Sequence, residues 1–122
     1  MKYMEPEQIV ALDGQDMVID PNETDEAVAQ RMRLLRRTVR PGMTIKEYAE
    51  RFLGVGYSRY LNVEHGSPLG KDLAGVIRKK VLGITTDWMF YGDTRGVHLD
   101  LLRDISERAE LDAGKGSTEA NG

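Results

Sequence analysis

The stretch TIKEYAERFLGVGYSRYLNVEHG, residues 44–66, decides the fold. Thr44 with Glu47 three residues later is the capping-box pattern that begins a helix, and Gly54 marks the end of that helix. A second short helix is expected over residues 57–65, directly after a very tight connection. Two short helices joined this closely cross at a steep angle, so the stretch predicts a helix-turn-helix.

Apolar residues at helical spacing predict further helices on both sides of this pair. Before it, a helix is expected to start near Thr24 and to cover residues 25–39, where apolar side chains recur at steps of four, three and four and arginines occupy the other side. Pro41 and Gly42 would end this helix. After it, residues 71–81, a short segment capped by Thr86, and residues 99–109 have similar periodicity. The inward side chains would be Val28, Met32, Leu35, Val39, Ile45, Tyr48 or Ala49, Phe52, Leu73, Ala74, Ile77, Val81, Trp88, Met89, Phe90, Leu99, Leu102, Ile105 and Ala109.

These helices divide the chain into a body and two ends. A helix-turn-helix domain is expected over residues 24–95 and an additional C-terminal helix over residues 96–111. Residues 1–23 form an N-terminal extension in which Asp13-Gly14 favours a hairpin, with disorder as the alternative. Residues 112–122, DAGKGSTEANG, have nothing to bury and are expected to be disordered. The expected fold class is all-α.

The composition is that of one domain without thiol chemistry. The chain has 122 residues and no cysteine, which excludes disulfides, zinc–thiolate sites and a cysteine nucleophile. No apolar run approaches the roughly 18–20 residues needed to cross a bilayer. The N-terminus MKYMEPEQ also lacks the apolar stretch of a secretory signal. A cytoplasmic protein with no membrane contact is expected.

The net charge of −3 hides an uneven distribution. Residues 1–24 carry one lysine and six acidic residues. Residues 25–95 carry thirteen Lys or Arg residues and eight acidic residues, and residues 96–122 carry three Lys or Arg residues and six acidic residues. A basic middle favours a nucleic-acid partner, because basic side chains neutralise phosphates and release counterions. A net of +5 is modest, however, and a solvated surface with no partner explains the charge equally well.

The second helix of the predicted pair has a polar start and an apolar remainder. Its first three side chains, Tyr57, Ser58 and Arg59, are polar. Of the later ones, Tyr60, Leu61 and Val63 can turn toward the core, whereas the polar Asn62 points outward. In a helix-turn-helix, the second helix lies in the major groove with its first residues at base edges. Arg59 can form a bidentate bond to guanine, Ser58 can bond a base or phosphate, and Tyr57 can contact phosphate or a thymine methyl.

Over roughly residues 25–95 the chain resembles the lambda-repressor-like helix-turn-helix regulators, also called the Xre or Cro/repressor type. The resemblance lies in MTIKEYAERFLGVGYSRYLNVEHGSPLGKDLA and GITTDWMFYGD, where Glu64 with Gly66 is similar to the Glu-x-Gly that ends the family's third helix. It implies a five-helix domain of bacteria or phages that binds double-stranded operator DNA, usually as a homodimer, in the cytoplasm at the nucleoid. It also implies a sequence-specific transcriptional regulator, most simply a repressor, with no cofactor.

The resemblance also indicates the residues of the site. Arg36 or Arg37, late in the first helix, would pair with Glu64 to support the recognition helix and would touch phosphate. Ser67 and Lys71 lie where a phosphate would be held, although a loop and a helix cap explain them as well. Taken with the polar start of the second helix, the predicted DNA-binding residues are Thr44, Lys46, Tyr57, Ser58, Arg59, Asn62, Ser67 and Lys71.

Two positions depart from the family pattern. Ile45 stands where most members have a DNA-contacting Gln directly after the cap. The step from Ala49 to Gly54 is five residues where the family has four. An extra residue must therefore be absorbed by a longer helix or a bulged turn. The alternative register would bury the unpaired carboxylate of Glu50, which is costly, so an insertion is expected.

Other functions find little support in the sequence. His65 and His98 lie far apart without further metal-ligand spacing, and no catalytic constellation or small-molecule site is evident, so neither an enzyme nor a metal protein is expected. The rival hypothesis is a protein-interaction module of the same fold, such as an antirepressor or antitoxin-like partner, that does not bind DNA. A third possibility is that the acidic ends cover the basic middle and restrain DNA binding.

Overall fold

The computed structural model describes residues 20–121, with side chains described for residues 20–114. Every regular element in this part of the chain is a helix, which confirms the all-α class for it. The hairpin predicted around Asp13-Gly14 lies outside the described residues. Among the described helices, none has the length and apolar character to span a membrane. In chain order the elements are η1 (Pro21–Glu23), α1 (Asp25–Val39), α2 (Ile45–Glu47), η2 (Tyr48–Leu53), α3 (Tyr57–Glu64), α4 (Lys71–Lys80), α5 (Thr86–Tyr91) and α6 (Leu99–Asn121).

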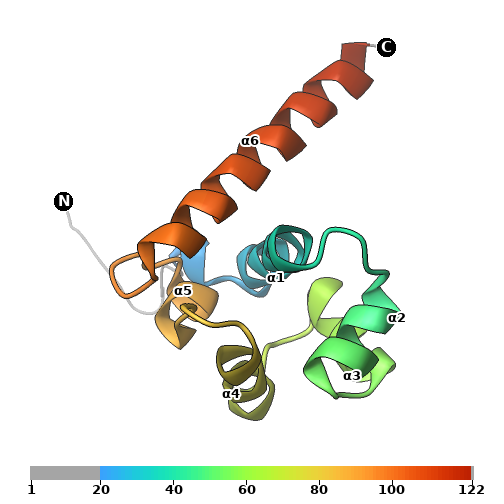
Figure 1. Ribbon diagram of the computed structural model, residues 1–122, viewed down its shortest axis with the longest axis vertical. Helices are drawn as coiled ribbons and strands as arrows, with labels where there is room; N and C mark the ends of the chain where they lie inside the picture. The colour runs from blue at the N-terminus through green and yellow to red at the C-terminus, as the bar shows by residue number, and fades with distance from the viewer. Residues whose placement is uncertain (1–19, 122) are drawn as a thin grey trace, which may run out of the picture.

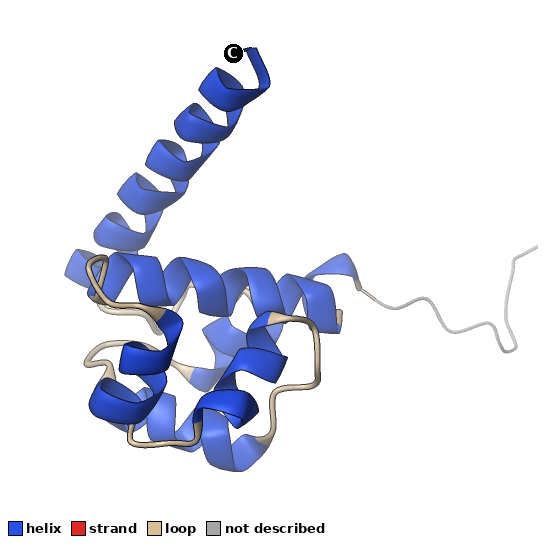
Figure 2. Ribbon diagram, turned by 90° about the vertical axis from the view of Figure 1, so that its right-hand side faces the viewer, coloured by secondary structure: helices blue, strands red, loops and turns tan. Residues whose placement is uncertain are grey.

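The helices from α1 to α5 gather into a body, and α6 extends away from it (Figure 1). α1 contacts η1, α3, α5 and α6, so it is the element on which most of the others pack. Figure 2 shows the same arrangement from the side, with most of α6 standing clear of the body. One cluster of buried side chains joins these elements; its largest fully buried members are Met32, Leu35, Tyr48, Leu53, Tyr60, Leu73, Ile77 and Met89.

α1 forms where its caps and periodicity predict it. The side chain of Thr24 accepts a hydrogen bond from the backbone N–H of Ala27, which satisfies one of the free donors at the helix start. The buried residues of α1 follow helical spacing: Val28, Ala29, Met32 and Leu35. The helix ends before Pro41, because proline disfavours helical backbone in the residue that precedes it.

α2 and η2 form one continuous helical segment with an unusual second half. The predicted capping box is present: the Thr44 hydroxyl accepts from the N–H of Glu47, and the Glu47 carboxylate accepts from the N–H of Thr44. η2 is a π-helix, in which each turn holds more residues than an α-helical turn. Ala49 is fully buried and Glu50 is exposed, so the register that would bury the carboxylate of Glu50 is not the one that forms.

Gly54 closes η2 in a backbone conformation that favours glycine. Its φ is 76° and its N–H donates to the carbonyl of Ala49. Side chains with a Cβ rarely adopt this left-handed region. The glycine therefore allows the sharp reversal that brings α3 next to α2.

Two predicted boundaries at the C-terminal side need correction. Thr85, not Thr86, caps α5, because the hydroxyl of Thr85 accepts from the N–H of Trp88. α6 continues to Asn121 instead of ending at residue 111, so its backbone is helical where disorder was expected. No proline interrupts the extension, and adding residues to an existing helix is easier than starting one. Asp112 on the extension also pairs with Arg37 of α1, at 2.7 Å.

Candidate functional site

The start of α3 presents its polar side chains to solvent. Ser58, Arg59 and Asn62 are exposed and Tyr57 is half-buried, whereas Tyr60 on the opposite side is fully buried. Gly56 occupies the cap position and provides no side-chain acceptor for the first N–H groups of the helix. The side chains of Ser58 and Arg59 are therefore accessible at the surface, and that of Tyr57 is partly accessible.

The other end of α3 is held by a buried ion pair. The carboxylate of Glu64 accepts two hydrogen bonds from Arg36 of α1, from Nε at 2.8 Å and from the terminal nitrogen NH2 at 3.1 Å. Glu64 is 0% exposed, and Arg33 donates to its backbone carbonyl as well. Such a two-pronged contact fixes direction as well as distance. Of the two arginines named from the sequence, Arg36 makes this contact, while Arg37 pairs with Asp112 of α6.

Arg36 keeps its charge in this environment. Burial lowers the pKa of its guanidinium, but the hydrogen bond and attraction from Glu64 outweigh burial, and the pKa is raised overall. The pair is thus ionic, and either group would be a buried charge without the other. This makes α3 dependent on α1 for its position.

Two tyrosine rings pack beside the ion pair. Tyr48 and Tyr60 are each 1% exposed, with ring centroids 5.3 Å apart. Burial, and the nearby negative charge of Glu64, raise the pKa of both phenols well above their usual value. The hydroxyl of Tyr60 donates to the carbonyl of Met32 at 3.4 Å. Both phenols stay neutral wherever the protein is folded at ordinary pH.

Alkaline pH should destabilise the fold through these two tyrosines. Above the unfolded pKa of about 10, the unfolded chain loses phenol protons that Tyr48 and Tyr60 keep, so the free energy of unfolding falls as pH rises. Each contributes about 1.4 kcal/mol per pH unit once the unfolded phenol is ionised. The measurement is urea unfolding from about pH 9 to 11.5. In the Tyr60→Phe variant, the free energy of unfolding should fall less steeply with pH, by about 1.4 kcal/mol per pH unit once the unfolded phenol is ionised. Equal slopes for the two chains would contradict this.

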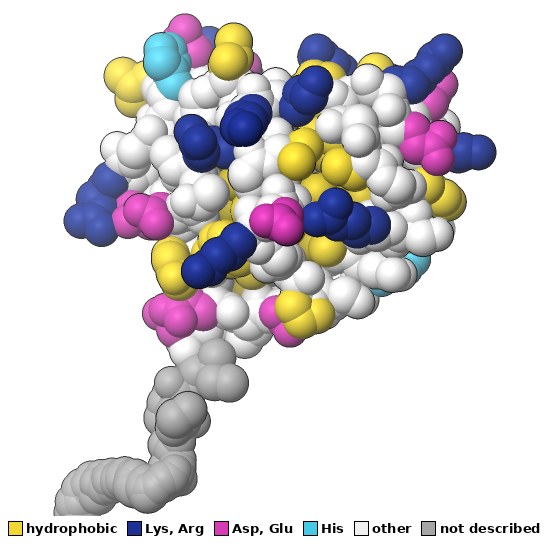
Figure 3. Space-filling model, turned by 90° about the horizontal axis from the view of Figure 1, so that it is seen from below, with side chains coloured by type: hydrophobic (Ala, Val, Ile, Leu, Met, Phe, Trp, Pro, Cys, Tyr) yellow, Lys and Arg dark blue, Asp and Glu magenta, His cyan; other side chains and the backbone are white. Residues whose placement is uncertain are grey.

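The candidate phosphate contacts lie at the starts of α2 and α4 and in the loop that joins α3 to α4. Lys46, Ser67 and Lys71 are exposed, and Thr44 is exposed with its hydroxyl engaged as an acceptor in the capping box. Contacts join α2 to α3, and η2 to both α3 and α4, so these helix starts belong to adjacent elements. Figure 3 views the side of the molecule below α3 and α4: Lys and Arg side chains are spread across it, with Asp and Glu between them.

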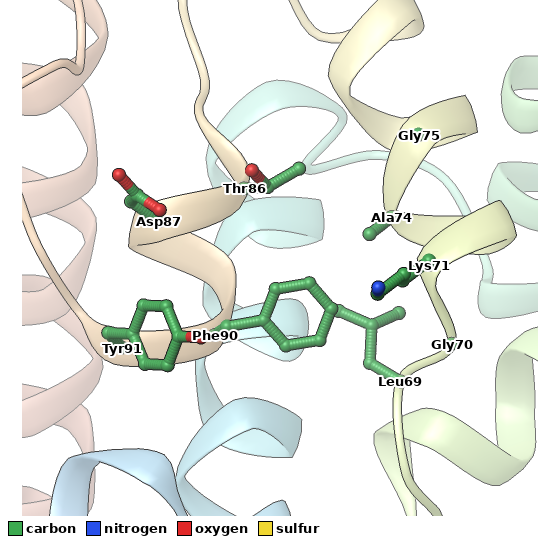
Figure 4. A pocket seen from close by; sticks show the side chains of 9 residues that line it. All are labelled: Leu69, Gly70, Lys71, Ala74, Gly75, Thr86, Asp87, Phe90 and Tyr91. Carbon is green, nitrogen blue, oxygen red and sulfur yellow. The ribbon is translucent and has the colours of Figure 1, made fainter.

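A groove of 610 Å³ lies apart from the start of α3, between the start of α4 and α5. Leu69, Phe90 and Lys71 are among its lining residues. In Figure 4 the ring of Phe90 points from α5 toward Leu69. No residue of α3 lines this groove, so it is separate from the predicted base-reading residues.

Sequence reasoning missed two supporting arginines of α1. Arg33 holds the C-terminal end of α3, and Arg31 donates to the carbonyl of Met89 at 3.0 Å, which ties α5 to α1. Both were assigned to the solvated face of their helix. The available signal was position: Arg33 and Arg36 are three residues apart and so lie on one face. Within the described residues, no group of three His, Cys, Asp or Glu side chains is placed to hold a metal ion.

Comparison with known proteins assigns the chain to no family. No family model matches the sequence, and no curated protein or solved structure matches it. The functional conclusion therefore depends on the geometry of the residues described above.

Proposed function

We propose that the chain is a sequence-specific double-stranded DNA-binding protein that regulates transcription, most simply a repressor, with a body of the lambda-repressor-like kind. One observation carries this proposal: α3 has an exposed polar start and an end fixed by Glu64 and Arg36. A helix held this way can enter the major groove with its first residues at the bases. Such a protein works at the nucleoid in the cytoplasm.

The base-reading role falls to the first turn of α3. Arg59 is exposed and makes no ion pair among those found in the described residues, so its guanidinium is free to bond the two acceptors of guanine. Ser58 bonds a base or phosphate, Tyr57 contacts phosphate or a thymine methyl, and Asn62 reaches the groove from the next turn. Ile45 is half-buried and apolar, so it forms no hydrogen bond to a base. Discrimination between DNA sequences therefore depends on α3 alone.

Backbone contacts would then set the register on the duplex. Lys46, Ser67 and Lys71 are exposed and bind phosphates, and the hydroxyl group of Thr44 donates to a phosphate as well. Arg36 and Arg37 are occupied by carboxylates, so neither is assigned a phosphate. A homodimer would place two α3 helices roughly 34 Å apart on one face of the duplex.

Arg59→Ala and Lys71→Ala should separate base reading from phosphate binding. Enrichment of bound sequences from random duplexes first identifies the preferred site. Arg59→Ala should then lower the preference for that site by roughly 10- to 100-fold, since a bidentate guanine contact is lost. Lys71→Ala should weaken binding to all duplexes alike and reduce the slope of affinity against salt by about one unit. If no sequence is enriched by the full chain, the proposal is wrong.

A protein-interaction module of the same fold is the second candidate. Two observations favour it: the net charge is −3, and Ile45 replaces the Gln expected to contact DNA. A DNA column separates the two proposals. Retention that is lost between low and moderate salt supports DNA binding, whereas passage through the column together with a co-purifying protein supports the alternative.

A further inference from the structure

The groove between the start of α4 and α5, which we call the α4–α5 groove, is open because small residues line its α4 side. These are Gly70, Ala74 and Gly75, and a Cβ added at either glycine would meet no atom within 4 Å. Gly75 lies inside α4, where glycine is less favourable than alanine. Its φ is not among the positive values, so neither the backbone nor the packing requires a glycine there. What this glycine provides is space in the groove.

The side chains on the two sides of the α4–α5 groove suit a flat apolar molecule. Leu69 precedes α4, and the ring of Phe90 on α5 points toward it (Figure 4). Tyr91 is 52% exposed, and its ring centroid lies 6.2 Å from that of Phe90. Aromatic rings of this kind offer a large apolar contact area. The volume of 610 Å³ falls within the range of roughly 300–1,000 Å³ that is typical of small-molecule sites.

Two charged residues line the α4–α5 groove, Lys71 and Asp87. Lys71 is the first residue of α4, is exposed, and takes part in none of the ion pairs that join described side chains. In Figure 4 its ammonium nitrogen points toward the space between the two helices, whereas the carboxylate of Asp87 points away from α4. A molecule in the groove therefore meets a positive charge.

We propose that the α4–α5 groove binds a small amphipathic acid, a molecule with a flat aromatic body and one carboxylate. The body lies between Leu69 and Phe90, in the space that Gly75 leaves open, and the carboxylate pairs with Lys71. Removal of the apolar body from water favours binding. The charge of Lys71 selects the acid over a neutral molecule of the same shape.

The consequence for DNA rests on the proposed function, in which Lys71 is a phosphate contact. A carboxylate on Lys71 competes with a DNA phosphate for the same ammonium group. The acid therefore lowers the affinity for DNA, and DNA lowers the affinity for the acid by the same factor. No residue of α3 lines the groove, so the base preference stays as it is. The groove is thus the site of an effector that weakens DNA binding.

The pair 2-naphthoate and 2-naphthamide tests the charge requirement, because both share one aromatic body and only the first is charged. Each is added to the full chain without DNA, and the amide signals of Gly70 and Gly75 are followed by NMR. Naphthoate should shift both signals saturably at millimolar concentration. Naphthamide should bind roughly threefold to tenfold more weakly. Lys71→Gln should reduce the affinity for naphthoate to that for naphthamide. No saturable shift with naphthoate, equal affinities for the two probes, or an unchanged affinity in Lys71→Gln overturns the proposal.

Gly75→Leu and Gly114→Leu form a matched test of the position. Both add one side chain to a helical glycine at which a Cβ would meet no atom within 4 Å, and Gly114, on α6, does not line the groove. Leucine favours a helix more than glycine does, so both variants should fold. Gly75→Leu fills the groove and should weaken naphthoate roughly tenfold or more, measured at the amide of Gly70. Gly114→Leu should leave the affinity unchanged. Loss in both variants or in neither contradicts the assigned site.

Binding to the preferred duplex at matched ionic strength tests the competition for Lys71. Saturating naphthoate should weaken DNA binding by the full chain by no more than Lys71→Gln does, and should not weaken binding by Lys71→Gln or Gly75→Leu any further. An unchanged DNA affinity of the full chain overturns the effector role. A chain that binds naphthoate but no DNA overturns the proposed function alone. A chain that selects a DNA sequence but binds no naphthoate overturns the groove site alone.

Discussion

Arg36→Met should lower the free energy of unfolding by about 3–5 kcal/mol, because it leaves the carboxylate of Glu64 buried without a partner. Glu64 is 0% exposed, and both of its carboxylate oxygens accept from Arg36. Methionine replaces the unbranched stem of the arginine side chain and omits the guanidinium, so the packing of the stem against the core changes little. The measurement is urea unfolding at neutral pH.

Two variants distinguish this effect from a general sensitivity of α1. Arg37→Met removes the ion pair with Asp112, in which the arginine side chain is 37% exposed and the aspartate side chain 26% exposed. This variant should lower the free energy of unfolding by less than about 1 kcal/mol. Arg36→Met with Glu64→Leu removes both charges together and should recover most of the stability lost by the single change. If Arg36→Met is as stable as Arg37→Met, the pair of Arg36 with Glu64 does not hold α3.

Local signals in the sequence were sufficient for the helices of the body. The caps at Thr24 and Thr44 and the glycine at position 54 act within one turn of chain, so their effect can be read without knowing the fold. Helical periodicity then identified most of the buried side chains, including Met32 and Leu73. The same reasoning placed the first three residues of α3 on the surface.

Contacts between distant segments could not be read in this way. Arg36 and Arg37 are adjacent and chemically identical, and only the packing of α1 on α3 and α6 decides which of them meets Glu64. The length of α6 was missed for a similar reason, since a weakly apolar helix gains its support at Asp112 from another element.

Deletion of Glu50 should leave the fold intact, whereas deletion of Gln30 should unfold it. Both residues are exposed and helical, so neither deletion removes a core side chain. In the regular helix α1, one missing residue rotates everything that follows by about 100°. Met32 and Leu35 then leave the core, at about 2–5 kcal/mol each. Such a loss exceeds what a domain of this size can sustain.

η2 responds differently because it already holds one residue more than an α-helical turn. Removing Glu50 lets the turn close to α-helical geometry while Ala49, Leu53 and Gly54 keep their places, so the free energy of unfolding should stay within about 1 kcal/mol of the full chain. Thermal unfolding followed by circular dichroism measures both deletions. A cooperative transition for the Glu50 deletion and none for the Gln30 deletion is expected. If both deletions abolish it, the widened turn is an integral part of the packing around Tyr48, and the extra residue is not a tolerated insertion.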